Sequence, residues 1–296
     1  MTPPYKCTFT IVAIFATSCY DNQKHIGGDI MAAFGFIGIG NMGGAIAIAA
    51  AKAHDPGDIL VSAGHPERAA AFARQHGMVA ATNEEIARDC KFVILGVKPQ
   101  FMASVLGALK PILEVRTDCV LVTMAAGMTM QQIANLVGGG YPVIRIMPNT
   151  PARIGKGVIQ YDWNDRCREE DVEEFLKILD SAGYMSHLPE KLIDAGSAVS
   201  GSGPAFVAMF IEAMADGGVI CGLPRATAME YAARTLIGTA ELMLQSGDHP
   251  GKMKDAVCSP GGSTLQGVRA LEKGAFRSAI TEAIIATWEK NKEFAK

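Results

Sequence analysis

The stretch at residues 34–44 reads F-G-F-I-G-I-G-N-M-G-G and is the best starting point for interpreting the chain. Its first residues are apolar, as in a short buried strand, and residues 45–53 continue as an alanine-rich segment typical of a helix. Between them, Gly38, Gly40 and Gly43 form G-x-G-x-x-G in the strand–turn–helix context of the dinucleotide-binding fingerprint. These glycines would permit the turn, let the backbone approach a pyrophosphate, and let helix and strand pack closely. The stretch predicts a nucleotide site, and a helix-capping turn is the alternative.

The composition indicates a compact protein with an α/β fold. The chain has 296 residues, of which 49% are hydrophobic and 19% charged, enough for two domains with buried cores. A net charge of −3 gives no reason to expect nucleic acid or an anionic membrane as a partner. The seven cysteines are odd in number and lack C-x-x-C spacing, so we expect a reducing, cytoplasmic compartment and no metal site.

Residues 1–30 do not fit the pattern that follows. An apolar run at residues 8–16 leads to small residues before Cys19, which resembles a weak secretion or lipoprotein signal. The run is too short to span a membrane, and the nucleotide fold begins directly after Met31. We therefore expect 1–30 to be a poorly ordered leader outside the fold.

Strand and helix patterns then alternate. Continuous apolar runs predict strands at 34–38, 58–62, 78–81, 92–97, 119–123 and 143–147. Helices are predicted between them at 42–53, 66–76, 83–88, 99–110 and 129–137. This alternation predicts a parallel sheet covered on both faces, extended by 158–161, a helix at 169–182, and 184–187. We interpret residues 31–189 as a Rossmann-type dinucleotide-binding domain.

From residue 190 to 296 the pattern predicts helices only, at 204–218, 225–245, 253–257, 264–273 and 277–294. The helix at 204–218 is apolar nearly all round, so we expect a central buried helix. Glu212 and Asp216 within it argue against a membrane span. So much apolar surface in a small all-α domain predicts that a second subunit completes it.

The end of the second strand bears on the choice of cofactor. NAD enzymes usually place Asp or Glu there to hold the ribose 2′-hydroxyl. This chain has no acid at that point, and Ser62, His65 and Arg68 lie nearby. The pattern favours NADP(H) over NAD(H), although the three could equally be surface residues of a turn.

Three further strand ends should contribute to the site, because ligands bind at the carboxyl ends of parallel strands. Small residues and prolines at 96–99, 124–127 and 147–151 leave room for a flat nicotinamide. Lys98 could also be an ordinary solvated lysine, and the run at 147–151 an interdomain elbow.

A second glycine cluster, S-P-G-G-S-T at residues 259–264, lies between two predicted helices. Its consecutive N–H groups at a helix start, with nearby hydroxyls, suit a small carboxylate. A simple capped helix is the alternative. The G-S-G at 201–203 links helices and is therefore not a nucleophile elbow.

Together these motifs resemble those of the pyrroline-5-carboxylate reductases, the last enzymes of proline synthesis. The matching runs include F-I-G-I-G-N-M-G at 36–43, V-K-P-Q at 97–100, R-I-M-P-N-T-P at 145–151, D-A-G-S-A-V-S-G-S-G-P-A-F at 194–206 and V-C-S-P-G-G-S-T at 257–264. The resemblance covers residues 31 to about 290. It implies a Rossmann domain followed by a helical dimerisation domain, in a homodimer or a larger ring of dimers, acting on a small-molecule substrate.

The resemblance also implies roles for particular residues. Thr264 would be the catalytic contact to the ring nitrogen, the backbone around Ser263 would hold the substrate carboxylate, and Glu190 would be an acid near the substrate. Ser259 and Gly262 complete the predicted substrate loop. The residues predicted to bind the cofactor, from the fingerprint, the strand ends and the resemblance, are Ile37, Gly38, Ile39, Gly40, Asn41, Met42, Gly43, Ser62, Asn83, Gly96, Val97, Lys98, Pro99, Met124, Ala125 and Ala126.

The sequence leaves two other functions open. A reductase of the β-hydroxyacid dehydrogenase type would need a catalytic lysine early in the second domain, where Lys191 is the candidate without the usual glycine-rich setting. A non-catalytic nucleotide-binding scaffold would need a damaged substrate loop, and residues 259–264 are intact. Family members often carry Asn or Arg where this chain has Ala63 and Gly64, which leaves NAD(H) possible as cofactor.

Overall fold

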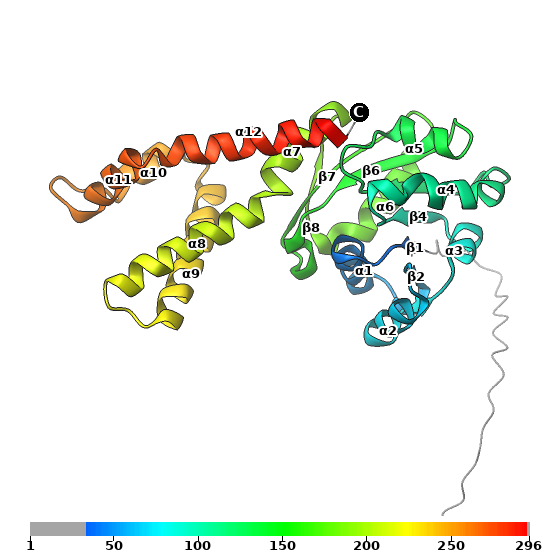
Figure 1. The fold of residues 1–296 in the computed structure, drawn as a ribbon, viewed down its shortest axis with the longest axis horizontal. Coiled ribbons are helices and arrows are strands. Elements are labelled where there is room, and N and C mark those ends of the chain that lie inside the picture. The colour runs from blue at the N-terminus through cyan, green and yellow to red at the C-terminus, as the bar shows by residue number, and fades with distance from the viewer. Residues whose placement is uncertain (1–33, 295–296) are drawn as a thin grey trace, which may run out of the picture. The chain divides into compact units, whose positions relative to one another are not determined.

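The structure, a computed structural model, describes residues 34–294 (Figure 1). The expectation for residues 1–30 lies outside the described part of the chain. Within residues 34–294, a sheet with flanking helices is followed by a segment made only of helices. The predicted fold class, an N-terminal Rossmann-type sheet followed by an all-α segment, is confirmed.

One eight-stranded sheet has the order β3-β2-β1-β4-β5-β6-β7-β8. The first six strands in this order, from β3 through β2, β1, β4 and β5 to β6, pair in parallel. Strand β7 runs antiparallel to β6, and β8 is parallel to β7. The sequence pattern indicated the parallel part and the extension, and it did not indicate the reversal at β7. The strands are β1 (Phe34–Ile37), β2 (Ile59–Ser62), β3 (Val79–Ala80), β4 (Phe92–Leu95), β5 (Val120–Thr123), β6 (Val143–Met147), β7 (Gly157–Trp163) and β8 (Gly183–His187).

Helices cover both faces of this sheet, so its central strands are buried on both sides. Phe36 and Ile94 point into one core with α1 and α6, while Ile37 and Leu95 point into the other with α3, α4 and α5. This alternation explains why β1, β4 and β5 are apolar at successive positions. The helices are α1 (Asn41–Ala53), α2 (Pro66–His76), α3 (Asn83–Asp89), α4 (Pro99–Leu113), α5 (Met130–Leu136) and α6 (Glu169–Leu179).

The remaining helices are α7 (Glu190–Ser200), α8 (Gly203–Ile220), α9 (Arg225–Ser246), α10 (Pro250–Ala256), α11 (Ser263–Lys273) and α12 (Phe276–Phe294). Helices α8 and α9 pack side by side (Figure 1). Their small buried cluster consists of Ala215, Ala228 and Ala232. The expectation of a central buried helix at 204–218 is wrong within one chain, because α8 has more apolar surface than α9 alone can cover. Met209 on α8, for example, is 68% exposed.

Among the described residues, one stretch, Glu190–Ile220, has the length and hydropathy of a membrane-spanning helix. By length and composition alone this is weak evidence, which helices of water-soluble proteins also provide. The stretch contains the turn at Gly201 and Ser202 between α7 and α8, and α8 carries Glu212 and Asp216.

Candidate active site

The glycine turn after β1 is shaped by contacts between backbones. Gly38 has φ +96°, a conformation that favours glycine. A Cβ atom on Gly43 would lie 2.1 Å from the carbonyl oxygen of Gly38, and one on Gly96 would lie 2.2 Å from the same oxygen. A Cβ on Gly40 would meet nothing within 4 Å. Gly38 and Gly43 are therefore required for packing, whereas Gly40 faces open space in which a phosphate could approach the backbone.

The start of α1 provides free hydrogen-bond donors at this open side. Its N-cap residue is Gly40, no side chain caps the helix, and the first turn holds no acid. The first N–H groups of a helix lack partners within the helix, and the helix dipole favours an anion there. The residues of the fingerprint thus fit a bound pyrophosphate.

A cavity of about 370 Å³ opens beside this turn. It brings together residues that follow β1, β2 and β4 with the start of α3. An adjoining cavity of about 430 Å³ shares Ala63 and Asn83 with it and extends along β2 and α2. Predicted cofactor residues that line the first cavity are Ile37, Gly38, Asn83, Val97 and Lys98, joined by Ala63, Gly64 and, from α4, Phe101, Ser104 and Val105. Sequence reasoning missed the α4 residues, which face the site only because of how that helix packs.

Ser62, at the end of β2, is buried and its hydroxyl lies 2.6 Å from Oδ1 of Asn83 and 3.4 Å from the carbonyl oxygen of Phe36. Its proton is therefore donated within the fold, where it orients Asn83. His65 and Arg68 are exposed at the start of α2. No acid lies at the end of β2 itself, where an NAD enzyme would hold the ribose 2′-hydroxyl, although Glu84 and Glu85 also line the adjoining cavity.

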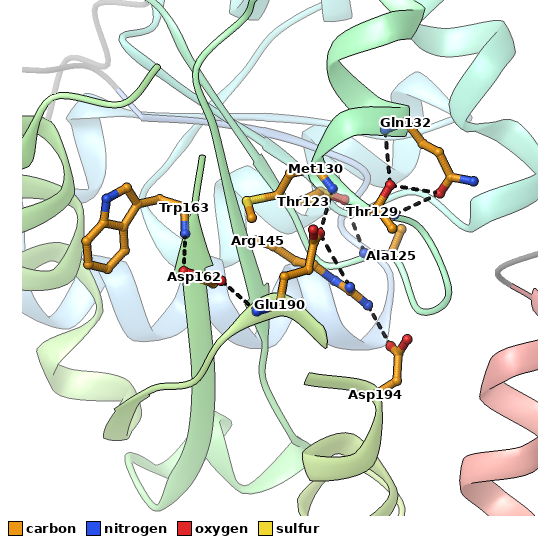
Figure 2. A network of polar contacts seen from close by, with 10 residues as sticks. All are labelled: Thr123, Ala125, Thr129, Met130, Gln132, Arg145, Asp162, Trp163, Glu190 and Asp194. Carbon is orange, nitrogen blue, oxygen red and sulfur yellow. Dashed lines mark hydrogen bonds and ion pairs between the residues drawn. The ribbon is translucent and has the colours of Figure 1, made fainter. Parts of the chain in front are cut away.

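The loop that holds the predicted nicotinamide residues Met124, Ala125 and Ala126 follows β5. The N–H of Ala125 donates to Oγ1 of Thr123 at 3.3 Å, and Gly127 adopts φ +73°. The loop ends at α5, whose N-cap residue Thr129 forms a reciprocal capping box with Gln132 (Figure 2). Both ends of the loop are therefore fixed by local hydrogen bonds.

A buried arginine network lies next to this loop (Figure 2). Arg145 of β6 is 1% exposed, and its Nη2 lies 2.6 Å from Oδ1 of Asp194. Its Nη1 lies 3.5 Å from Oε1 of Glu190, and that oxygen accepts the N–H of Met130 at 2.6 Å. The structure thus places the Glu190 carboxylate against the start of α5 and against Arg145. Sequence reasoning missed Arg145, although a charged residue inside the otherwise apolar run V-I-R-I-M was a usable signal.

Helix α7 is bound to the sheet at both of its ends. At its first residue, the N–H of Glu190 donates to Oδ2 of Asp162 on β7 at 2.6 Å. At its last residue, the carbonyl oxygen of Ser200 accepts from Nδ2 of Asn149 at 2.9 Å, and the Ser200 hydroxyl lies 2.8 Å from Nε2 of Gln160. Side chains of β7 and of the elbow after β6 therefore hold this helix in place.

The predicted substrate loop forms the turn between α10 and α11. Gly261 has φ +72°, and the N–H of Gly262 donates to the carbonyl oxygen of Ser259 at 3.0 Å. Helix α11 begins at Ser263 with no side-chain cap, and Thr264 is an exposed residue of its first turn. Thr264 is therefore not a helix cap. Within residues 34–294, no hydrogen bond joins this loop to the sheet, so the structure of one chain does not bring Thr264 to the cofactor residues.

A separate cavity of about 570 Å³ adjoins the elbow after β6. Thr150 of the elbow, the turn between α7 and α8, the first residues of α8, and Thr287 of α12 line it. It joins two of the runs that carried the family resemblance, at 145–151 and 194–206. Away from this cavity, burial in the core raises the pKa of the Cys119 thiol to about 11 and that of Cys90 to about 12, as expected of unreactive core cysteines.

Comparison with known proteins first defines the class. Residues 33–127 match the family described as "NADP oxidoreductase coenzyme F420-dependent", and residues 190–294 match "Pyrroline-5-carboxylate reductase dimerisation". With the fingerprint and the sheet described above, the chain is a Rossmann-type oxidoreductase with a helical dimerisation domain.

Full-length relatives then identify the family. The chain is 41% identical over 265 residues to pyrroline-5-carboxylate reductase of Escherichia coli, covering 88% of this chain and 98% of that protein. It is 39% identical to the enzyme of Synechocystis, with the same coverage. A crystal structure of Plasmodium falciparum pyrroline carboxylate reductase with NADP bound superposes with a TM-score of 0.82 at 30% identity, covering 90% of this chain and 98% of that one. The chain belongs to the pyrroline-5-carboxylate reductase family. The predicted resemblance is confirmed, and the β-hydroxyacid dehydrogenase and scaffold readings are set aside.

Proposed function

We propose that the chain reduces the cyclic imine of 1-pyrroline-5-carboxylate to L-proline with NADPH, the final step of proline biosynthesis. One observation carries the chemistry: the two predicted ligand turns both lead into helices, α1 and α11, whose starts no side chain caps. One open start suits a pyrophosphate and the other a small carboxylate. These are the anionic groups of the cofactor and of the substrate.

NADPH is the proposed cofactor because the end of β2 carries no carboxylate to hold a free 2′-hydroxyl. The related Plasmodium structure contains NADP, which supports the same choice. When bound, the reduced nicotinamide supplies the hydride, and the chain supplies alignment and electrostatics. The start of α1 would hold the pyrophosphate, and residues 124–126 would border the nicotinamide.

The substrate would bind through its carboxylate to the N–H groups at the start of α11, beside Ser263. The hydroxyl of Thr264 would accept a hydrogen bond from the protonated ring nitrogen, whose positive charge makes C5 electrophilic. Ser259 and Gly262 shape this turn. Because the loop is exposed in one chain, we propose that the enzyme works as a homodimer. The scattered cysteines support a reducing, cytoplasmic compartment. A larger ring of dimers is the alternative, and light scattering distinguishes the two.

The test is nicotinamide oxidation with pyrroline-5-carboxylate, run with NADPH and with NADH on the wild type, Thr264→Ala and Thr264→Ser. One lost hydrogen bond to a charged group is worth about 1.5–3 kcal/mol, so kcat/KM of the alanine variant should fall about 10- to 100-fold. The serine variant should recover much of this loss, and the dissociation constant of NADPH should change little. A wild type inactive with both cofactors would refute the function. Unchanged kcat/KM in Thr264→Ala would remove Thr264 from the reaction.

A further inference from the structure

The Glu190 carboxylate makes two contacts inside the fold through one of its oxygens. Its Oε1 accepts the N–H of Met130 at 2.6 Å and lies 3.5 Å from Nη1 of Arg145. The Arg145 side chain is 2% exposed, so the positive charge beside Glu190 is buried and water weakens the attraction between the two groups very little. A carboxylate that already faces a buried guanidinium has little remaining field with which to stabilise a substrate cation.

These contacts connect the loop at residues 124–129 to the start of the dimerisation domain. The capping box of α5 uses the N–H groups of Thr129 and Gln132, and Glu190 takes the N–H of Met130 between them. A carboxylate at a helix start is also favoured by the helix dipole. Glu190 is itself the first residue of α7, held to β7 by Asp162 (Figure 2). One side chain therefore joins the loop that would border the nicotinamide to the domain that carries the substrate loop.

We propose that Glu190 is a positioning residue, which holds the 124–129 loop in place for the nicotinamide and does not contact the substrate. This inference rests on the proposed function and replaces the sequence-based hypothesis that Glu190 is an acid beside the imine. Arg145 completes the arrangement, because it contacts both Glu190 and Asp194 on the first turns of α7. Loss of the Glu190 contact should loosen the loop while leaving α11 and its turn intact.

A positioning role and a role as an acid beside the imine predict different effects for Glu190→Gln and Glu190→Ala. Both contacts of Glu190 use one oxygen, so Glu190→Gln keeps an acceptor for Met130 and loses only the charge. Glu190→Ala removes the acceptor and leaves the N–H of Met130, a buried residue, unpaired. Glu169→Gln and Glu169→Ala are matched controls, because Glu169 is likewise the first residue of a helix, α6, and is exposed.

The readouts are NADPH binding by fluorescence titration and the pH profile of kcat/KM for pyrroline-5-carboxylate. We expect Glu190→Ala to weaken NADPH binding and to lower kcat/KM, each about tenfold or more, because a buried donor is left unpaired. Glu190→Gln should stay within about threefold of the wild type with an unchanged pH profile, since a neutral acceptor still satisfies the N–H of Met130. Both Glu169 variants should match the wild type.

A different pattern would overturn the inference. If Glu190→Gln lost as much kcat/KM as Glu190→Ala, with normal NADPH binding and an altered pH profile, Glu190 would act on the substrate through its charge. If both Glu190 variants bound NADPH and turned over like the wild type, the loop would not depend on Glu190. The glutamine variant keeps the test decisive should the alanine variant fail to fold. An inactive wild type would refute the proposed function, a result distinct from either of these.

Discussion

The sheet part of the chain, residues 34–187, and the helical part, residues 190–294, bury their apolar residues to very different extents. In the sheet part, every residue of β1, β4 and β5 is buried between two layers of helices. In the helical part, the cluster between α8 and α9 is made of alanines, while Ile220 is 86% and Leu244 79% exposed. Each square ångström of apolar surface left in water forfeits about 25 cal/mol. The sheet part therefore has a complete core within one chain, and the core of the helical part requires a second chain.

The largest expected effect comes from placing a charge on the exposed helical surface. Met209→Asp puts a carboxylate on α8 where the side chain is 68% exposed. If the partner chain covers this position, an unpaired buried charge costs about 3–5 kcal/mol, which weakens the dimer on the order of 100-fold or more. Light scattering and the reductase assay, run over a range of protein concentrations, should show monomers with little activity.

Val115→Asp is the matched control for this variant. Val115 is 80% exposed after α4, in the sheet part. We expect it to leave the oligomeric state and activity unchanged, because exposed apolar residues scattered singly need no partner. A fully active dimer of Met209→Asp would show that α8 faces solvent at this point. The helical part would then need the second chain less than its exposed apolar surface suggests.

A smaller effect is expected from Gly43→Ala, which tests whether the sheet part is stable by its own packing. Its Cβ would lie 2.1 Å from the Gly38 oxygen, so the turn must shift, at a cost of about 1–3 kcal/mol. Gly40→Ala meets no atom within 4 Å and should melt like the wild type, yet its methyl group would occupy the space of the pyrophosphate and weaken NADPH binding. Calorimetry and NADPH titration separate the two effects. Equal Tm values for both variants would contradict this assignment of the glycines.

The smallest expected effect is a pH dependence that belongs to the sheet part. The hydrogen bond from Arg168 lowers the pKa of buried Asp171, burial opposes this, and Lys91 at 2.7 Å lowers it further. The resulting stability is present above the ordinary Asp pKa of about 3.9 and is lost as pH falls through the lowered pKa. Because Arg168 is largely exposed, we expect about 1 kcal/mol.

Urea unfolding of the wild type and Asp171→Asn from pH 7 to pH 3 measures this contribution. The difference in the free energy of unfolding between the wild type and Asp171→Asn should be constant down to about pH 4 and then shrink, since protonated Asp is as neutral as Asn. This difference should not depend on protein concentration, because Asp171 lies in the sheet part. Asp165→Asn, whose acid is 91% exposed, is the control. A difference that grew towards low pH would contradict the lowered pKa.

Local patterns predicted most of the sheet part. The strand, glycines and helix at 34–53 follow one another in sequence, so their geometry depends on neighbouring residues alone. The reversal at β7 was not predicted, because strand direction is set by the path of the connection and not by the composition of the strand. Arg145 was missed for a related reason: its partner Asp194 lies 49 residues further along the chain.

The candidate site also combines features set by neighbouring residues, which the sequence predicts, with contacts between distant residues, which it does not. Gly38 of the fingerprint and the ends of β2 and β4 were predicted and line adjoining cavities, while the role of Gly96 in packing on Gly38 could be seen only in three dimensions. Glu190 was selected as a site residue, and its contacts suggest a different task from the one expected. Thr264 stays a prediction, because the surroundings of an exposed loop in an oligomer depend on residues of another chain.

The attachment of α7 has a consequence for motion during turnover. Asp162 binds the first residue of this helix, and Asn149 and Gln160 bind the last, so α7 moves with the sheet as one body. A rotation of the dimerisation domain relative to the nucleotide fold cannot pivot at Pro189, where the sheet ends, without breaking these bonds. Helix α12 packs on α7 as well, and Nδ2 of Asn291 donates to the carbonyl oxygen of Asp194 at 3.3 Å, so the last helix of the chain is attached to the same body. The rigid part of the enzyme thus extends beyond the last strand of its sheet and includes at least α7.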